Sequence, residues 1–155
     1  MNRLSALFVL ALAIFAGSAA AAKQTPGPDL RVFGLQPLHW GMSADEIRAA
    51  LPGLTGDGAA MLEKPDYVFS GCHFALRLEL ARNRLVAITM NSDLANATCD
   101  VQIGAVIDAA YGPAYDMQLG TGDALLSWPG ATNITFYRTL EDLTHGEITF
   151  RQDGK

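Results

Sequence analysis

Charged residues are scarce in this chain, at 17% of its 155 positions, and half of the residues are hydrophobic. Such a composition excludes an intrinsically disordered protein, which is poor in apolar residues and rich in charge. Lysine and arginine number 11 against 16 aspartates and glutamates, so the chain lacks the basic excess typical of nucleic-acid binding. Glycine and proline are too few for a collagen-like or low-complexity chain. The length allows one domain with one core.

The sequence also lacks the motifs that mark common active sites. It contains no G-x-S-x-G nucleophile elbow, P-loop, H-E-x-x-H or EF-hand spacing. The histidines His39, His73 and His145 are scattered, and the Cys72-His73 pair with Cys99 lacks a fourth ligand for tetrahedral zinc. We therefore expect no enzymatic activity, no catalytic residues, no cofactor and no metal site.

Long hydrophobic runs are absent except at the N-terminus, where residues 4–16 are almost entirely apolar. Arg3 precedes this run and the small residues 17–22 follow it, an order that predicts a secretory signal peptide over residues 1–22. An uncleaved membrane anchor is the alternative, since a bilayer core needs about 20 residues. The weakly hydrophobic alanine run favours cleavage after Ala22. We expect a periplasmic or secreted protein without stable membrane insertion.

The predicted mature chain begins with a polar, proline-containing linker at residues 23–30, followed by one domain at residues 31–155. Its only cysteines are Cys72 and Cys99. In an oxidising compartment one such pair predicts one disulfide. The bond would close the loop between the two cysteines, which is expected to stabilise the folded state by roughly 3–4 kcal/mol. The alternative, a reactive thiol at Cys72, is disfavoured because a neighbouring His73 on a strand points to the opposite face.

Local patterns predict a helix and strands in each half of the domain. Ser43 and Glu46 form a capping-box pair that predicts a helix over residues 44–51. A second helix is predicted over residues 101–111, with Thr98 as its N-cap. Apolar residues at alternate or clustered positions predict strands over residues 31–35, 67–70, 73–81, 85–91, 124–128, 133–139 and 143–151.

The two halves overlay at a constant offset of sixty residues, at which apolar positions keep their phase. A segment of that length is one supersecondary unit that cannot bury its own apolar face alone. The fold class we predict is therefore α+β, with two tandem helix-plus-three-strand units over residues 38–92 and 96–151. Their helices would pack on antiparallel sheet. A chance overlay of two helix-then-strand segments is the alternative.

Two short motifs carry a resemblance to known families. Gly41-Met42-Ser43 with Ile47 and Leu51, and the helix end Tyr111-Gly112-Pro113, resemble the exported repeats of the β-lactamase-inhibitory-protein-like and SmpA/OmlA-type families. The resemblance implies a tandem α-β-β-β fold and action by binding other proteins, as inhibitors or envelope-assembly subunits. Unlike the outer-membrane members, this chain has no lipid-acceptor cysteine.

Five residues stand out as candidates for contact with a partner. Trp40 lies just before the first predicted helix and Trp128 just before the Pro129-Gly130 turn. Tryptophan is favoured at binding hot spots, although both residues also fit core positions. Glu141, Asp142 and His145 belong to the richest polar cluster, residues 141–147, which is either an acidic binding loop or a solvated turn.

These observations favour an exported, non-enzymatic protein-binding module of the bacterial envelope, whose partner is another envelope or secreted protein and not a nucleic acid. The alternative is a small periplasmic hydrolase or ligand-binding protein that uses residues 141–147. A concave pocket with converging polar groups near His145 would favour the alternative, and an open sheet with exposed aromatic residues would favour the binding module.

Overall fold

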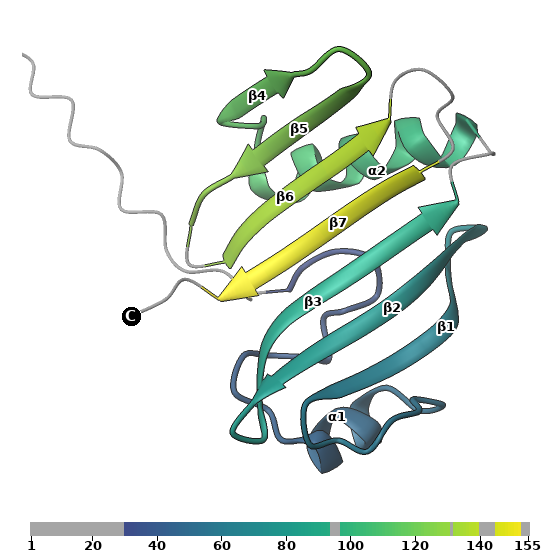
Figure 1. Ribbon diagram of the computed structural model, residues 1–155, viewed down its shortest axis with the longest axis vertical. Coiled ribbons are helices and arrows are strands. Elements are labelled where there is room, and N and C mark those ends of the chain that lie inside the picture. Colours follow the sequence, from purple (N-terminus) through teal and green to yellow (C-terminus); the bar gives the residue numbers. More distant parts are fainter. Residues whose placement is uncertain (1–29, 94–96, 131, 140–144, 153–155) are drawn as a thin grey trace, which may run out of the picture.

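The computed structural model describes residues 30–93, 97–130, 132–139 and 145–152. Two helices and seven strands follow one another along the chain, and Figure 1 shows them with the labels used below. Their bounds are α1 Ala44–Ala50, β1 Met61–Phe69, β2 Cys72–Ala81, β3 Arg84–Asp93, α2 Ala97–Tyr111, β4 Asp116–Leu119, β5 Asp123–Trp128, β6 Thr132–Thr139 and β7 His145–Gln152.

All seven strands belong to one antiparallel sheet in the order β1-β2-β3-β7-β6-β5-β4. The sheet is continuous because β3 and β7 pair over seven residues, from Ala87 opposite Arg151 to Asp93 opposite His145. In Figure 1 α2 and the chain that leads into α1 lie behind the sheet, and α1 lies at the bottom of the view, near the β2–β3 turn. The other face of the sheet turns toward the viewer.

The predicted fold class, two tandem helix-plus-three-strand units, is wrong. The structure has a single seven-stranded sheet with helices of only 7 and 15 residues, and is closer to a mainly-β fold. The prediction counted three strands in each half and missed β4 in the second half. Periodicity within each half also could not reveal that β3 and β7 would join all the strands into one sheet.

Most of the individual elements were predicted correctly, within a few residues of their observed ends. The strand predicted at residues 67–70 is the end of the much longer β1. Thr98, predicted as an N-cap, lies inside α2, which begins at Ala97.

Residues 30–42 form turns where a strand was predicted over residues 31–35. Phe33 and Gly34 both have positive φ, at 56° and 73°, which a strand cannot contain. A Cβ at Gly34 would collide with the Tyr67 hydroxyl, which donates a hydrogen bond to the Phe33 carbonyl oxygen. This turn places the Phe33 ring in the core, within 6.2 Å of the rings of Phe69, Phe74 and Phe150.

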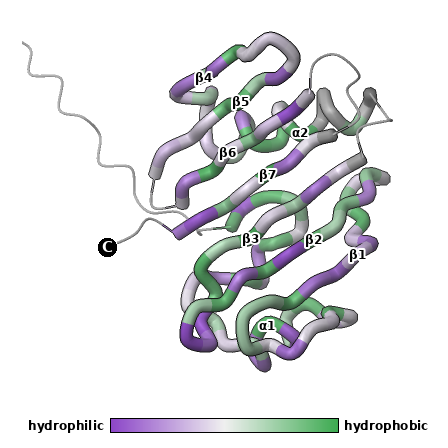
Figure 2. The backbone as a smooth tube through the Cα atoms, viewed as in Figure 1, coloured by the Kyte–Doolittle hydropathy of each residue, from purple (hydrophilic) through white to green (hydrophobic). Residues whose placement is uncertain are grey.

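The core lies between one face of the sheet and the segments that cover it, which are residues 30–42, α1 and α2. Along β2 the buried and exposed residues alternate strictly at first, and Figure 2 shows the same alternation of hydropathy on the central strands. Ile103 and Ile107 of α2 are buried against the core, as is Ile47 of α1. Burial of these side chains is the main driving force for holding the helices on one face.

The predicted disulfide is confirmed: Cys72 is bonded to Cys99, with their Cα atoms 5.7 Å apart. Cys72 is the first residue of β2 and Cys99 lies in the first turn of α2. The bond therefore ties the β1–β2 hairpin to α2.

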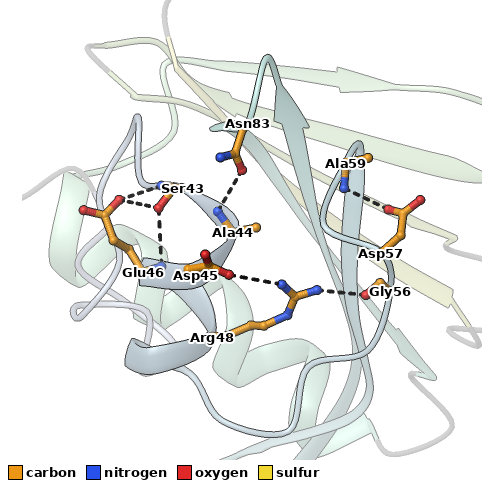
Figure 3. Close-up of polar contacts among 9 residues, drawn as sticks. All are labelled: Ser43, Ala44, Asp45, Glu46, Arg48, Gly56, Asp57, Ala59 and Asn83. Atoms are coloured by element: carbon orange, nitrogen blue, oxygen red, sulfur yellow. Dashed lines mark hydrogen bonds and ion pairs between the residues drawn. The ribbon is translucent and has the colours of Figure 1, made fainter.

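The predicted capping box of α1 is also confirmed (Figure 3). The Glu46 carboxylate accepts hydrogen bonds from the Ser43 amide at 2.7 Å and the Ser43 hydroxyl at 2.8 Å. These bonds, the backbone one first, lower the pKa of Glu46. Asn83 in the β2–β3 turn accepts a hydrogen bond from the Ala44 amide, so α1 is held to the sheet at its first residue.

Candidate functional site

The edge strand β4 and the residue before it carry the most exposed large apolar side chains of the described residues. Tyr115, Met117 and Leu119 are 85%, 58% and 69% exposed. All four residues of β4 are exposed, and the strand pairs with β5 on one side while forming the edge of the sheet on the other.

The register shows which face of the sheet these side chains occupy. Met117 lies opposite Leu126 of β5, and Leu119 lies opposite Ala124, which is buried. Directly opposed residues of an antiparallel pair point to the same face. Met117 and Leu119 therefore extend the apolar face of the sheet, but α2 lies behind β5, β6 and β7 and does not reach behind β4 (Figure 1).

The backbone of β4 is also arranged for pairing at its outer side. The Gly120 amide donates to the Asp123 carbonyl at 3.0 Å and closes the β4–β5 hairpin. Hydrogen-bonded positions alternate along an antiparallel strand, so Gln118 faces β5 whereas Met117 and Leu119 direct their N–H and C=O groups outward. No strand among the described residues pairs with that side of β4.

The opposite edge of the sheet is closed off. The outward-facing backbone of Glu63 in β1 already exchanges two hydrogen bonds with Thr55, at 2.8 and 3.0 Å. The register of β1 then shifts between Lys64 and Tyr67, around Pro65. Proline and a bulge are both common means of preventing a sheet edge from pairing with another chain.

The face of the sheet turned away from the helices is polar. One row of paired residues crosses all seven strands on this face: Glu63, Arg77, Thr89, Thr149, Thr135, Ser127 and Asp116. Arg77 pairs with Glu63 at 3.0 Å. On the same face desolvation raises the pKa of Tyr137, and the neighbouring Asp123 carboxylate raises it further. This face is mostly polar, and its exposed large apolar side chains are Met61 and Val68 of β1.

The two tryptophans predicted as partner contacts are both packed against the core, to different extents. Trp128 is only 4% exposed, and its indole nitrogen donates to the Gly112 carbonyl at 2.9 Å, so it is a core residue. Trp40 is half-buried against the core and donates to the Thr132 hydroxyl at 2.9 Å. Both positions agree with the core alternative for these residues.

The predicted polar cluster is largely outside the described residues. Glu141 and Asp142 lie in the undescribed stretch 140–144. His145 is the first residue of β7, opposite Asp93, and its side chain is likewise not described. The hydrolase alternative that rests on this cluster therefore stays a prediction.

The described parts of the chain contain no group of three or more His, Cys, Asp or Glu side chains that could hold a metal ion. Within the same ranges, no helix is both long and apolar enough to cross a bilayer.

β4 was not predicted, although two features of the sequence are typical of it. Apolar residues alternate with polar ones from Tyr115 to Leu119, and the glycine-rich segment 120–122 separates them from the next strand. Both are typical of a hairpin. That β4 would be an uncovered edge depends on the strand order, which those signals do not contain.

Comparisons with protein-family models, with functionally described proteins and with solved structures find no match. The resemblance to the β-lactamase-inhibitory-protein-like and SmpA/OmlA-type families stays a prediction.

Proposed function

We propose that this protein is an exported, non-enzymatic protein-binding module of the bacterial envelope, and that its partner adds an extended segment to the edge of β4. The observation that carries this proposal is the combination of outward-facing backbone groups and exposed apolar side chains at Met117 and Leu119.

Strand addition uses these two features together. The backbone N–H and C=O groups of the edge give affinity, and the side chains at alternate positions select the sequence that binds. Tyrosine and methionine are also enriched at protein interfaces. The four residues of β4 would accept a short segment with apolar side chains on the same face as Met117 and Leu119.

The proposed location rests on the predicted signal peptide, with cleavage expected after Ala22. The Cys72–Cys99 disulfide supports it, since disulfides persist in oxidising compartments. The family resemblance, to proteins that bind other proteins, favours the same function. Of the two tryptophans, neither is needed in this proposal, because the contact surface is Tyr115, Met117 and Leu119.

The proposal is tested with the mature protein, residues 23–155, as bait in a cross-linked envelope fraction read by mass spectrometry. The decisive variant is Met117→Lys, which places a charge on the apolar side of the β4 edge. Met61→Lys is the matched control, since Met61 is the exposed methionine of the opposite edge strand.

We expect one protein in stoichiometric amount with the unsubstituted bait and with Met61→Lys, and its loss with Met117→Lys. Capture undiminished by Met117→Lys would contradict a β4 contact. No capture by a folded, oxidised bait would contradict the function as a whole.

A further inference from the structure

We infer that the apolar pocket between α2 and the β1–β2 hairpin is a binding site for a small uncharged aromatic molecule. The pocket encloses about 390 Å³ and is independent of the β4 edge, which contributes no residue to it. Its volume falls within the range of roughly 300–1,000 Å³ that is usual for ligand sites.

The floor of the pocket is aromatic. Phe33 and Phe74 lie there almost fully buried, and Phe69 forms part of the wall. The Phe33 ring meets the Phe69 ring edge-on, with centroids 5.6 Å apart and planes at 78°, and lies 6.0 Å from the Phe74 ring. Of the three rings only that of Phe69 is partly accessible, so it is the one that a ligand ring can contact in the edge-to-face or offset geometry that aromatic pairs prefer.

The opposite wall consists of small or branched apolar residues of α2. Ile103 is buried at its base, Val106 is half-buried, and Ala105 and Ala109 are exposed at the mouth. From Ile103 to Ala109 the helix rises about 9 Å, which matches a compact ring system better than a long extended chain. Larger side chains at the two alanines would close the opening.

The chemistry of the lining selects against charge. None of its side chains is ionisable, because Cys72 is held in the disulfide. Ser70, in the β1–β2 turn, supplies the one hydroxyl. A charged ligand would lose its hydration without gaining a partner, whereas an uncharged aromatic ligand buries apolar surface and can form one hydrogen bond.

The two walls are fixed relative to one another. The Cys72–Cys99 bond joins the hairpin to the first turn of α2, beside the pocket. The hairpin itself turns tightly through Ser70 and Gly71, which both have positive φ. A site with rigid walls loses little conformational entropy when a ligand binds.

The test uses N-phenyl-1-naphthylamine, an uncharged aromatic probe whose fluorescence rises in apolar surroundings, with the purified oxidised protein. Ala109→Phe fills the mouth of the pocket from an exposed helix position, so it leaves the core intact. Ala75→Phe, on the exposed outer face of β2, adds the same ring elsewhere and is the matched control. Met117→Lys separates the pocket from the apolar β4 edge.

We expect saturable binding at one site, weakened at least tenfold by Ala109→Phe and unchanged by Ala75→Phe and Met117→Lys. Equal binding by Ala109→Phe and the unsubstituted protein would overturn the inference, and so would the absence of saturable binding. Loss of binding in Met117→Lys alone would place the probe at β4 and also overturn it. None of these outcomes bears on capture of a protein at β4.

Discussion

The two edges of the sheet differ in almost every feature that controls pairing with another chain. At β1 the outward backbone of Glu63 is bonded to Thr55, Pro65 removes a donor, and Glu63, Lys64 and Asp66 supply charge. The connection from α1 lies so close to β1 that a Cβ on Gly56 would meet the Met61 carbonyl oxygen at 2.6 Å. At β4 the charge is limited to Asp116, and no described strand or loop is bonded to its outer backbone.

The contrast shows that the β1 edge is protected against pairing with another chain and that the β4 edge is much less protected. An unprotected apolar edge promotes aggregation, and natural sheets usually block it with charge, proline, a bulge or a covering segment. This chain uses all four at β1. The exposed tyrosine, methionine and leucine at β4 are the surface at which the proposed partner would bind.

The largest expected difference concerns leucine on the two edge strands. Leu62 of β1 is 0% exposed and Leu119 of β4 is 69% exposed. Leu62→Ala leaves a cavity and should lower the free energy of unfolding by about 2–5 kcal/mol. Leu119→Ala should change it by less than about 0.5 kcal/mol. Urea unfolding measures both, and equal losses would mean that β4 is covered in the folded protein.

Removal of the disulfide should destabilise the β1 side most. Replacing both Cys72 and Cys99 by alanine should lower the free energy of unfolding by roughly 3–4 kcal/mol, if the closed loop acts by restricting the unfolded chain. In amide exchange the β1–β2 hairpin should open more than the β4–β5 hairpin, because Cys72 pairs with Phe69 of β1. A melting temperature unaffected by reductant would contradict a stabilising role for the disulfide.

Tyr67 of β1 provides a smaller, pH-dependent effect. Tyr67→Phe removes the hydrogen bond to the Phe33 carbonyl and should cost about 1 kcal/mol at neutral pH. Burial raises the pKa of Tyr67 above 10.0, so its contribution is complete below pH 10 and is lost as the pH rises through the raised value.

The Tyr67→Phe variant should therefore lose less stability at alkaline pH than the unsubstituted protein. Tyr115→Phe, at the exposed residue directly before β4, is the control and should reproduce the unsubstituted profile. Identical alkaline profiles for all three proteins would show that Tyr67 ionises without cost in the folded state.

The smallest effect is expected from the α1 cap beside β1. Hydrogen bonds from Ser43 lower the pKa of Glu46 below 4.5, so the contribution of this carboxylate is present above pH 4.5 and disappears as the pH falls through the lowered value. Glu46→Gln keeps the shape of the cap and should flatten this part of the acid profile. Unfolding curves between neutral pH and pH 3 measure it, and an unaltered slope would argue against the role of the charge.

Features that depend on a few neighbouring residues could be predicted from the sequence. Ser43 and Glu46 determine the start of α1 by themselves, and the alternation from Phe74 to Leu80 determines the inward face of β2. The disulfide followed from the number of cysteines and the predicted compartment.

Features that depend on strand order could not be predicted. The buried turn at Phe33 and Gly34 is stabilised by contacts with Tyr67 and distant rings, which no local pattern contains. The exposure of Met117 and Leu119 follows from the position of β4 beyond α2, so no local pattern distinguishes these two residues from core residues. The predicted candidates Trp40 and Trp128, selected by residue type, are accordingly packed against or within the core.

The most direct test of the account is amide hydrogen exchange at each residue of the protein, alone and with its captured partner. If the partner adds a strand to β4, the amides of Met117 and Leu119 should exchange much more slowly in the complex, while those of Met61 and Glu63 stay unchanged. Protection at β1, or on the polar face without any at β4, would contradict the account.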